Sequence, residues 1–296
     1  MGFEVRFKAS NLTYYLTSNP KPQTSNLSSM SNFTDKVCVI TGASSGIGWE
    51  LALLLAAEGA KLTLAARNEE RLNELAELCR QAGGKAHVVP TDVASEEACK
   101  NMVEETVETY GSLDMLVNNA GISMYTPFEE VEDLSFLEKI MQINFFGSMY
   151  CTYYALPYLK KSKGRIVGIS SLTGKTGVPT RTAYAASKHA MAGFFDSLRI
   201  ELMDTGVSVT MIYPGFVATE VRERALGSDG TSIGKSPVKE GEVMTAEECA
   251  KIIFRAAEDR KREVVMTLKA KLGLWMKLIA PSVVDNIARK SIETGK

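Results

Sequence analysis

Three side chains near the middle of the sequence could exchange a proton with a bound substrate. Tyr184 and Lys188 stand four residues apart in AYAASKHA, so on a helix both lie on one face within reach of each other. A nearby ammonium group favours the phenolate, and we expect Lys188 to lower the pKa of Tyr184 from about 10 toward neutrality. Ser171 ends the strand-like run GRIVGISS thirteen residues before Tyr184 and could hydrogen-bond the same substrate oxygen. This pattern predicts acid/base chemistry at a carbonyl oxygen.

A glycine-rich turn earlier in the chain predicts a site for a phosphate group. TGASSGIG, with Gly42, Gly46 and Gly48, follows the first strand-like run and leads into a helix over 47–58. Glycine permits the tight turn and a close approach of the backbone to a pyrophosphate, while the helix N-terminus presents free N–H groups to the anion. The spacing GxxxGxG differs from the commoner GxGxxG, but its place between a strand and a helix favours dinucleotide binding over a plain connection.

The residues after the second strand-like run bear on which dinucleotide binds. An acidic residue there would bind the ribose 2′-OH of NAD, whereas an arginine accommodates the 2′-phosphate of NADP. The run ends in LAARN, so Arg67 stands at this position and no carboxylate occurs before Glu69. NADP(H) is therefore favoured over NAD(H). The alternative is that Arg67 forms a solvent-exposed ion pair with Glu69 or Glu70.

Strand-like and helix-like segments alternate along the chain, as in proteins whose parallel sheet is covered by helices on both faces. Thr245 and Glu248 form a capping-box pattern ahead of one helix. We expect an α/β fold, a doubly wound parallel sheet of about seven strands in a single domain over 33–267. Short β-branched runs predict strands at 37–41, 61–66, 86–91, 114–119, 165–170, 207–213 and 262–266. Helical patterns occur at 47–58, 69–82, 95–110 and 184–204.

Composition excludes several other classes of protein. The chain has 296 residues, 45% of them hydrophobic, and a formal net charge of −1, which argues against a disordered chain and against a dedicated nucleic-acid binder. Five cysteines without a CxxC pair are typical of buried thiols in a reducing compartment, so we expect a cytoplasmic protein. The two histidines, His87 and His189, are interpreted as structural or surface residues, and no metal site is expected.

Both ends of the chain lie outside the predicted domain. Residues 1–32 are rich in Ser, Asn, Thr and Pro and predict a loose extension, with Met30 as an alternative start. No run approaches the roughly 20 apolar residues of a spanning helix. Residues 251–296 contain 11 basic and 5 acidic residues, and 268–296 mixes Trp275 and leucines with lysines. This tail predicts either a helix that packs on the core or in a dimer, or a peripheral contact with a membrane surface.

The order of the motifs resembles the short-chain dehydrogenase/reductase family. The likeness covers residues 33–267 and is greatest to the branch of 11β-hydroxysteroid dehydrogenase-like and DHRS-type reductases. It implies a Rossmann-type fold, an NADP(H)-dependent oxidoreductase acting on a carbonyl or secondary alcohol, and a homodimer or homotetramer built through helices near 95–160 and 184–204. The matching motifs are TGASSGIG at 41–48, NNAG at 118–121, QINFFG around Asn144, Ser171, the Tyr184-x-x-x-Lys188 pair and PGFVAT at 214–219.

The resemblance also implies roles for particular residues. Tyr184 looks like the general acid/base, Lys188 would lower its pKa and hold the nicotinamide ribose, and Ser171 would orient the substrate oxygen. Asn144 would anchor a water in the proton relay. The residues implied to contact the cofactor are Gly42, Ser44, Ser45, Gly46, Ile47, Gly48, Arg67, Asp92, Val93, Asn119, Ala120, Gly121, Tyr184, Lys188, Pro214, Gly215, Val217 and Thr219.

Two features of these motifs leave alternatives open. Asn118 and Asn119 could hold neighbouring strands together instead of contacting a ligand, because buried amides usually satisfy backbone groups. Ser45 occupies a position where many NADP-using relatives carry a basic residue, so Arg67 alone supports the 2′-phosphate. A non-catalytic dinucleotide-binding sensor could use the same fold, although a sensor has no need of the complete set of Asn, Ser, Tyr and Lys.

Loops at the carboxyl ends of the strands are expected to bind a small-molecule substrate. These loops are 122–128, 172–180 and 216–243, and their largely apolar side chains favour a lipophilic ketone or secondary alcohol. Residues 219–243 contain four glycines and are predicted to form a mobile lid, and no cluster of Arg or Lys there requires a phosphorylated substrate. The residues expected against the substrate are Ser171, Leu172, Tyr184 and Phe216, with Met124, Tyr125 and Val178 as further apolar candidates.

Overall fold

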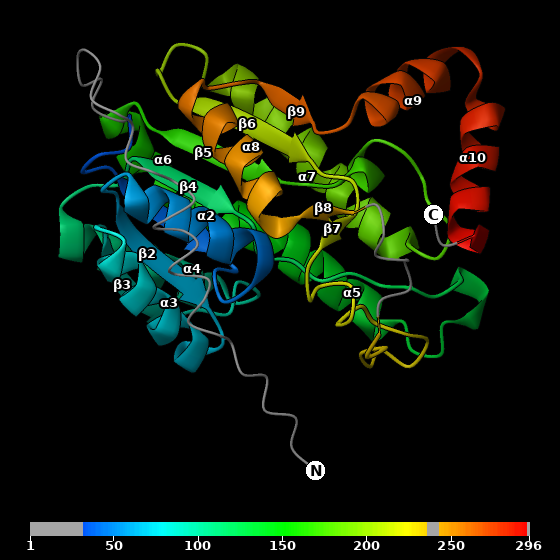
Figure 1. Cartoon of the computed structure of the whole chain (residues 1–296), viewed down its shortest axis with the longest axis horizontal. Coiled ribbons are helices and arrows are strands. Elements are labelled where there is room, and N and C mark those ends of the chain that lie inside the picture. The colour runs from blue at the N-terminus through cyan, green and yellow to red at the C-terminus, as the bar shows by residue number, and fades with distance from the viewer. Residues whose placement is uncertain (1–31, 236–242, 295–296) are drawn as a thin grey trace. The chain divides into compact units, whose positions relative to one another are not determined.

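A sheet of seven parallel strands forms the centre of the fold. The computed structural model describes residues 32–235 and 243–294, and within them the strand order is β3-β2-β1-β4-β5-β6-β9 (Figure 1). The order changes direction between β1 and β4, which is where doubly wound sheets bind their ligands. The strands are β1 (Val37–Thr41), β2 (Lys61–Ala66), β3 (Lys85–Pro90), β4 (Met115–Asn118), β5 (Arg165–Ile169), β6 (Ser208–Tyr213) and β9 (Glu263–Val265). Every predicted strand is confirmed, with ends that differ by at most one residue.

Helices cover both faces of the sheet, as predicted. On one face α2 (Gly46–Ala57), α3 (Glu69–Gln81) and α8 (Ala246–Glu258) pack their apolar sides against the strands. On the other face lie α4 (Glu96–Tyr110), α6 (Gly147–Ser162) and α7 (Thr182–Glu201). The strands between these layers are almost wholly buried, which explains why their sequences read as continuous apolar runs. Short elements complete the described chain: η1 (Phe128–Glu130), α5 (Ser135–Met141), η2 (Gln142–Phe146), η3 (Leu172–Gly174), β7 (Val217–Ala218) and β8 (Met244–Thr245).

Local sequence signals fix where several helices begin. The hydroxyl of Thr245 accepts a hydrogen bond from the N–H of Glu248 at 3.1 Å, and the carboxylate of Glu248 accepts one from the N–H of Thr245 at 3.0 Å. The predicted capping box at α8 is therefore confirmed. Asn68 caps α3 and Ser95 caps α4 in the same manner, each through one side-chain oxygen.

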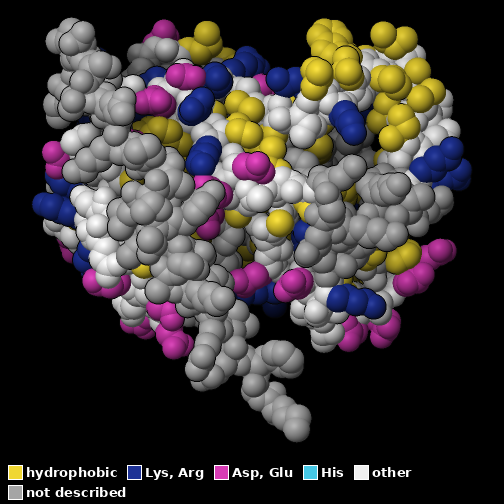
Figure 2. All heavy atoms as spheres, in the orientation of Figure 1, with side chains coloured by type: hydrophobic (Ala, Val, Ile, Leu, Met, Phe, Trp, Pro, Cys, Tyr) yellow, Lys and Arg dark blue, Asp and Glu magenta, His cyan; other side chains and the backbone are white. Residues whose placement is uncertain are grey.

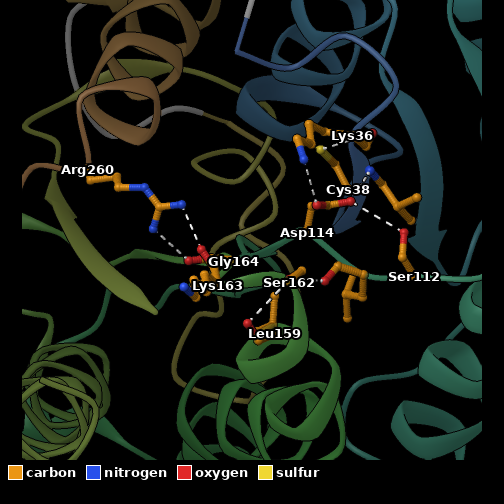
Figure 3. Close-up of polar contacts among 11 residues, drawn as sticks. Lys36, Cys38, Ser112, Asp114, Leu159, Ser162, Lys163, Gly164 and Arg260 are labelled. Atoms are coloured by element: carbon orange, nitrogen blue, oxygen red, sulfur yellow. Dashed lines mark hydrogen bonds and ion pairs between the residues drawn. The ribbon is translucent and has the colours of Figure 1, made fainter. Parts of the chain in front are cut away.

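Polar contacts join the amino ends of the strands (Figure 3). The carboxylate of Asp114, just before β4, accepts hydrogen bonds from the N–H of Val37 at 3.0 Å and from Nζ of Lys36 at 3.1 Å. The guanidinium group of Arg260, after α8, donates to the carbonyl oxygens of Lys163 at 2.7 Å and Gly164 at 3.0 Å. These contacts link β1 to β4 and α8 to β5 at the end of the sheet that lies away from the loops considered below.

The C-terminal tail forms two helices, α9 (Leu268–Ile279) and α10 (Pro281–Thr294), which are joined at Ala280. Pro281 starts the second helix, in keeping with the preference of proline for the first helical turn. None of the residues of α9 is fully buried, although Ala270 and Leu274 touch the core beneath α7. Among the described helices, none has the length and apolar character needed to cross a bilayer.

Some expectations fall partly or wholly outside the described residues. The extension 1–32, including Met30, is described only at Asn32, and residues 236–242 of the expected lid are also not described. Of the two histidines, His189 is exposed and its Nδ1 contacts the carbonyl of Ala185, while His87 lies at the sheet edge 3.6 Å from Glu105. All five cysteines are buried free thiols.

Candidate active site

A cavity of about 470 Å³ opens at the carboxyl ends of the strands. Each of β1, β2, β3, β4, β5 and β6 ends next to it, because parallel strands direct their following loops to one edge of the sheet. The predicted residues that line it are Gly42, Ser44, Ser45, Gly46, Ile47, Arg67, Asp92, Val93, Asn119, Ala120, Gly121, Ser171, Leu172, Tyr184, Lys188, Pro214, Gly215, Phe216, Val217 and Thr219. Two predicted site residues, Gly48 and Asn144, do not line it.

The glycine-rich turn is shaped for a close approach of the backbone. Gly42 and Gly46 adopt φ of +65° and +58°, a left-handed conformation that glycine accepts without strain. A Cβ on Gly42 would lie 2.8 Å from Cα of Ala120, and one on Gly48 would lie 2.6 Å from the carbonyl oxygen of Gly42. The absence of a side chain at Gly48 therefore lets α2 pack against the turn, and its expected contact with the cofactor stays a prediction. The cradle left by these missing side chains fits a dinucleotide pyrophosphate at the start of α2.

Asn119 supports this turn through its side chain. Its Nδ2 donates to the carbonyl oxygens of Thr41 at 2.9 Å and Gly42 at 3.1 Å, while its backbone N–H donates to Oγ1 of Thr41 at 3.0 Å. Asn118 points the other way and donates to Oγ1 of Thr152 at 3.0 Å. The interpretation of both asparagines as structural is therefore confirmed for their side chains, and Asn119 lines the cavity as well. Sequence reasoning missed Thr41, whose hydroxyl also accepts from the N–H of Ala120.

Arg67 lies at the carboxyl end of β2, exposed and on the cavity wall. Among the described residues it forms no ion pair with Glu69 or Glu70, so the alternative role proposed from the sequence is wrong for this structure. The nearby Arg71, in contrast, forms an ion pair: the carboxylate of Glu220 accepts a hydrogen bond from its Nη1 at 2.8 Å. Asp92 accepts from the N–H of Ala94, a contact within its own turn, and also lines the cavity.

The structure brings Tyr184, Lys188 and Ser171 to one point of the cavity. Tyr184 and Lys188 lie on the same face of α7, and Nζ of Lys188 is 5.8 Å from the centroid of the Tyr184 ring. Ser171 lies two residues after the end of β5, and its hydroxyl accepts a hydrogen bond from the N–H of Thr173 at 3.2 Å. Lys188 is 4% exposed and donates to the carbonyl oxygen of Ile169 at 2.9 Å. The predicted convergence of a phenol, an ammonium group and a hydroxyl is observed.

Burial, rather than charge, dominates the protonation of this group of residues. It lowers the pKa of Lys188 to about 8, because the charged ammonium loses its hydration. It also raises the pKa of Tyr184, against the opposing effects of Arg181 and of a hydrogen bond with Ser171. The expectation that Lys188 lowers the pKa of Tyr184 below its usual value is therefore wrong here. Both shifts favour the neutral form of the side chain, and a ligand that brings charge or hydrogen bonds to either group would change them.

Asn144 lies behind the cavity wall instead of facing it. It is fully buried in the π-helical turn η2, where its Oδ1 accepts from the N–H of Ile122 at 2.9 Å. Its Nδ2 donates to the carbonyl of Ile122 and to the hydroxyl of Ser187. These hydrogen bonds join the loop after β4 to α7, beneath Lys188. Sequence reasoning did not foresee the π-helical turn, a feature found frequently at functional sites.

Two further residues of the cavity were missed from the sequence. Arg181 and Arg222 line it together with Arg224, so basic side chains do gather at the substrate loops, contrary to the expectation for 219–243. These arginines stand in the segments PTRTAY and EVRER. A single sequence does not show whether an arginine lies on the surface or lines a cavity. Among the apolar candidates Val178 lines the cavity, whereas Met124 is buried in the core and Tyr125 lies outside the lining. Their side chains support the loop instead.

Comparison with known proteins decides the family. The family model described as short chain dehydrogenase matches residues 36–228, which is more than half of the chain. The chain belongs to the short chain dehydrogenase family. As a short chain dehydrogenase it binds a nicotinamide dinucleotide and is an oxidoreductase acting on CH–OH or C=O groups. The hypothesis of an enzyme is thereby confirmed over that of a sensor.

Relatives within the short chain dehydrogenase family cover most of the chain. The "11-beta-hydroxysteroid dehydrogenase-like 2" of Arabidopsis thaliana is 39% identical over 86% of this chain and 80% of its own length. The "Dehydrogenase/reductase SDR family protein 7-like" of Dictyostelium discoideum is 36% identical over 88% of this chain and 83% of its own. A solved alcohol dehydrogenase from the archaeon Thermococcus sibiricus, complexed with 5-hydroxy-NADP, superposes with a TM-score of 0.68 at 26% identity, over 78% of this chain and 95% of its own. The predicted Rossmann-type fold is confirmed.

Proposed function

We propose that this short chain dehydrogenase uses NADP(H) to interconvert a lipophilic ketone and its secondary alcohol. The observation that carries the proposal is the meeting of Tyr184, Ser171 and Lys188 beside the glycine cradle in one cavity. The bound nicotinamide supplies or accepts the hydride. The chain's own residues then have to position the carbonyl oxygen and move one proton.

Each catalytic side chain has a separate task in this proposal. In reduction, the Tyr184 hydroxyl donates its proton to the substrate oxygen, and in oxidation the phenolate takes it back. The Ser171 hydroxyl hydrogen-bonds the same oxygen and fixes the direction of approach. Lys188 supplies positive charge near the forming phenolate and a donor for the cofactor ribose. Asn144, held by Ile122 and Ser187, is a positioning residue that fixes the floor under Lys188.

Replacing the phenol tests this assignment directly. Tyr184→Phe should lower kcat by at least about 1000-fold, since the only proton donor to the substrate oxygen is removed. The dissociation constant for NADPH, measured by fluorescence titration, should stay within a few-fold of that of the native protein. Retained turnover in this variant would overturn the mechanism, and loss of NADPH binding would mean that Tyr184 chiefly supports the fold.

The choice of NADP(H) over NAD(H) rests on Arg67. Its side chain lines the cavity at the end of β2 and forms no ion pair with any residue that the structure describes, so it can bind the 2′-phosphate. The bound 5-hydroxy-NADP of the archaeal alcohol dehydrogenase supports the same choice. Arg67→Gln should weaken NADPH binding about 30-fold and leave NADH binding nearly unchanged. Arg71→Gln is the matched control, because that arginine is held by Glu220. Tighter binding of NADH by the native protein would contradict the proposal.

Peripheral contact with a membrane is a second property supported by a specific observation. Figure 2 shows apolar side chains gathered over α9 and α10, with basic side chains beside them. Trp275, Leu278 and Ile279 are 70%, 78% and 86% exposed, and Lys271 and Lys277 lie on the same helix. An apolar helix face flanked by lysines is suited to the interface of an anionic bilayer.

A triple substitution on α9 tests this contact. Replacing Trp275, Leu278 and Ile279 by serine should abolish cosedimentation with vesicles containing phosphatidylserine, because the exposed apolar area disappears. A Met203→Ser variant removes a 75% exposed side chain at the end of α7 and should leave vesicle binding intact. Equal cosedimentation of the triple variant and the native protein would rule out the membrane contact.

We also propose that two or four copies assemble through α6 and α7. Tyr153 on α6 and Ile200 on α7 are 70% and 66% exposed, and a shallow groove runs past Tyr153 between α4 and α6. Large exposed apolar side chains on neighbouring helices are typical of subunit interfaces. Light scattering after gel filtration should give a mass of two or four chains, and Tyr153→Asp should shift it toward the monomer. A monomeric native protein would contradict this assembly.

A further inference from the structure

Two arginine side chains are buried beside the catalytic tyrosine without an acidic partner. Arg181 and Arg222 both line the cavity, and each is only 7% exposed. Nε of Arg181 and both Nε and Nη1 of Arg222 are buried without a hydrogen-bond partner. Among the described residues, no Asp or Glu forms an ion pair with either side chain. A buried cation without a counter-charge is unfavourable and is rarely found without a functional reason.

Two other arginines of the molecule have hydrogen-bond or ion-pair partners for their guanidinium groups. Arg165 is buried to a similar degree, but its Nε donates to the carbonyl oxygen of Ala257 at 3.0 Å. Arg224 lines the same cavity as Arg181 and Arg222, yet it is half-exposed and paired with Glu220. Unlike Arg165 and Arg224, the described side chains of Arg181 and Arg222 keep buried donor atoms without a partner. Both side chains line the cavity where a substrate would lie.

The positions of the two guanidinium groups define where a ligand group would bind. Cζ of Arg181 lies 5.9 Å from the ring centroid of Tyr184 and 5.7 Å from that of Phe216, and Nη1 donates to the hydroxyl of Ser123 at 3.1 Å. Arg222 lines the same cavity as Arg181. Burial chiefly, and the positive charge of Arg222 to a lesser degree, lower the pKa of Arg181. Two adjacent guanidinium forks match the oxygens of a carboxylate or a phosphate.

We propose that Arg181 and Arg222 together bind an oxyanion, a carboxylate or a phosphate, that the substrate carries close to its reacting carbonyl. This inference rests on the proposed function, because it places the anion next to the carbonyl that Tyr184 protonates. Apolar side chains line the same cavity, among them Ile122, Val178 and Ala288, the last from α10. The substrate class is therefore an amphiphile, with an anionic group near the carbonyl and an apolar chain that extends toward α10.

Matched pairs of substrates test the preference for an anion and its chemical source. One pair is a long-chain oxo acid and its methyl ester, and the other is an alkyl hydroxyketone and its phosphate monoester. The native enzyme with NADPH should show a kcat/KM at least about 100-fold higher for the anionic member of one pair, since a desolvated charge pair is formed only with that member. The pair that shows the larger ratio identifies carboxylate or phosphate. Equal values within both pairs would overturn the inference while leaving the proposed function intact.

Arginine variants test whether these two residues cause the preference. Arg222→Met and Arg181→Met should each reduce the anionic-to-neutral ratio of kcat/KM by at least about 10-fold, mainly through KM. Arg222→Lys should retain part of the preference, because the charge remains but the fork is lost. Arg224→Met is the matched control from the same cavity and should change the ratio less than about 3-fold. An unchanged ratio in both methionine variants would overturn the assignment.

A binding measurement separates this inference from the proposed function and from a role in cofactor binding. Dodecyl phosphate and laurate should bind the NADP⁺-saturated native protein in calorimetry, and Arg222→Met should weaken the tighter of the two at least about 10-fold. NADPH affinity of Arg222→Met should stay near that of the native protein. If NADPH binding falls instead, as expected for Arg67→Gln, then Arg222 contacts the cofactor and the inference fails. Absence of NADPH binding by the native protein would contradict the proposed function itself.

Discussion

At the amino end of the central sheet, the buried carboxylate of Asp114 accepts from a backbone N–H, from Lys36 and from Ser112, and Arg260 donates to carbonyl oxygens of the neighbouring loops. At the carboxyl end of the same strands, Lys188 is buried with one carbonyl oxygen as its partner. Arg181 and Arg222 there keep buried donors unsatisfied. The charged groups named at the amino end are each held by several hydrogen bonds, whereas the buried cations named at the carboxyl end have fewer partners.

The difference indicates which end contributes to folding stability and which end is kept for ligands. Buried polar groups that are fully paired hold a fold in one arrangement, while unpaired ones reduce stability and gain partners only when a ligand arrives. The left-handed glycines of the turn after β1 belong to the same end as the unpaired cations. Substitutions at the amino end should therefore lower stability without changing binding. Those at the carboxyl end should change binding, and removal of a poorly paired buried charge there should raise stability.

The largest effect is expected at the glycine turn. An alanine Cβ at position 48 would lie 2.6 Å from both Nδ2 of Asn119 and the carbonyl oxygen of Gly42, so Gly48→Ala must displace the cradle. We expect the dissociation constant for NADPH to rise about 100-fold, because displacing binding groups by about 1 Å can have an effect of that size. Gly193→Ala is the control, because that Cβ would meet nothing within 4 Å, and it should stabilise α7 by up to about 1 kcal/mol. Unchanged NADPH affinity in Gly48→Ala would show that the glycine-rich turn is not part of the NADPH site.

Removal of the buried carboxylate tests the opposite end. Asp114→Ala leaves the N–H of Val37 without its partner and Lys36 without its counter-charge. The free energy of unfolding in urea should fall by about 3 kcal/mol, whereas NADPH affinity of the folded protein should be unchanged. A parallel loss of affinity and stability would show that the two ends are coupled, and the comparison would then fail.

Lys188 should destabilise the protein at neutral pH. Its pKa is about 8 in the folded chain and about 10.4 when unfolded, so the folded state binds the proton less tightly. Below pH 8 this difference opposes folding in full, and stability should rise as the pH increases from about 8 to about 10.4. Lys188→Met should therefore raise the free energy of unfolding by about 2 kcal/mol at pH 7 and by much less near pH 10. Urea denaturation at both pH values measures this, and a destabilised Lys188→Met protein at pH 7 would contradict the account.

The smallest effect is expected at Arg260. Its guanidinium group donates to three carbonyl oxygens, but the side chain is exposed and water can replace it. Arg260→Ala should lower the free energy of unfolding by about 1 kcal/mol. Turnover should not change, since the cavity lies at the other end of the sheet. A change in KM larger than about 3-fold would mean that the amino end also shapes the site.

Particular residues show which features of the fold and the site could be predicted from the sequence. The strand ends, the capping box at Thr245 and the convergence of Ser171, Tyr184 and Lys188 were all predicted, because each depends on neighbours within a few residues or on a regular alternation. The sequence did not show that Asn144 is bound to the loop after β4, that Gly48 packs against the turn, or that Met124 is buried. Each of these depends on which side of a packed element a residue faces, and that is set by contacts distant in sequence.

The sequence by itself determined the fold, the edge of the sheet that carries the site, and the family. Hydrophobic periodicity and glycine spacing depend on residues close together in the chain, so they can be recognised in the sequence alone. The tertiary structure alone decided that Arg181 and Arg222 are both buried, with no acidic partner among the described residues, and that burial shifts the pKa of Lys188 downward. Charge pairing and desolvation depend on distances across the folded chain, since the same arginine is solvated on a surface and unsatisfied in a cavity.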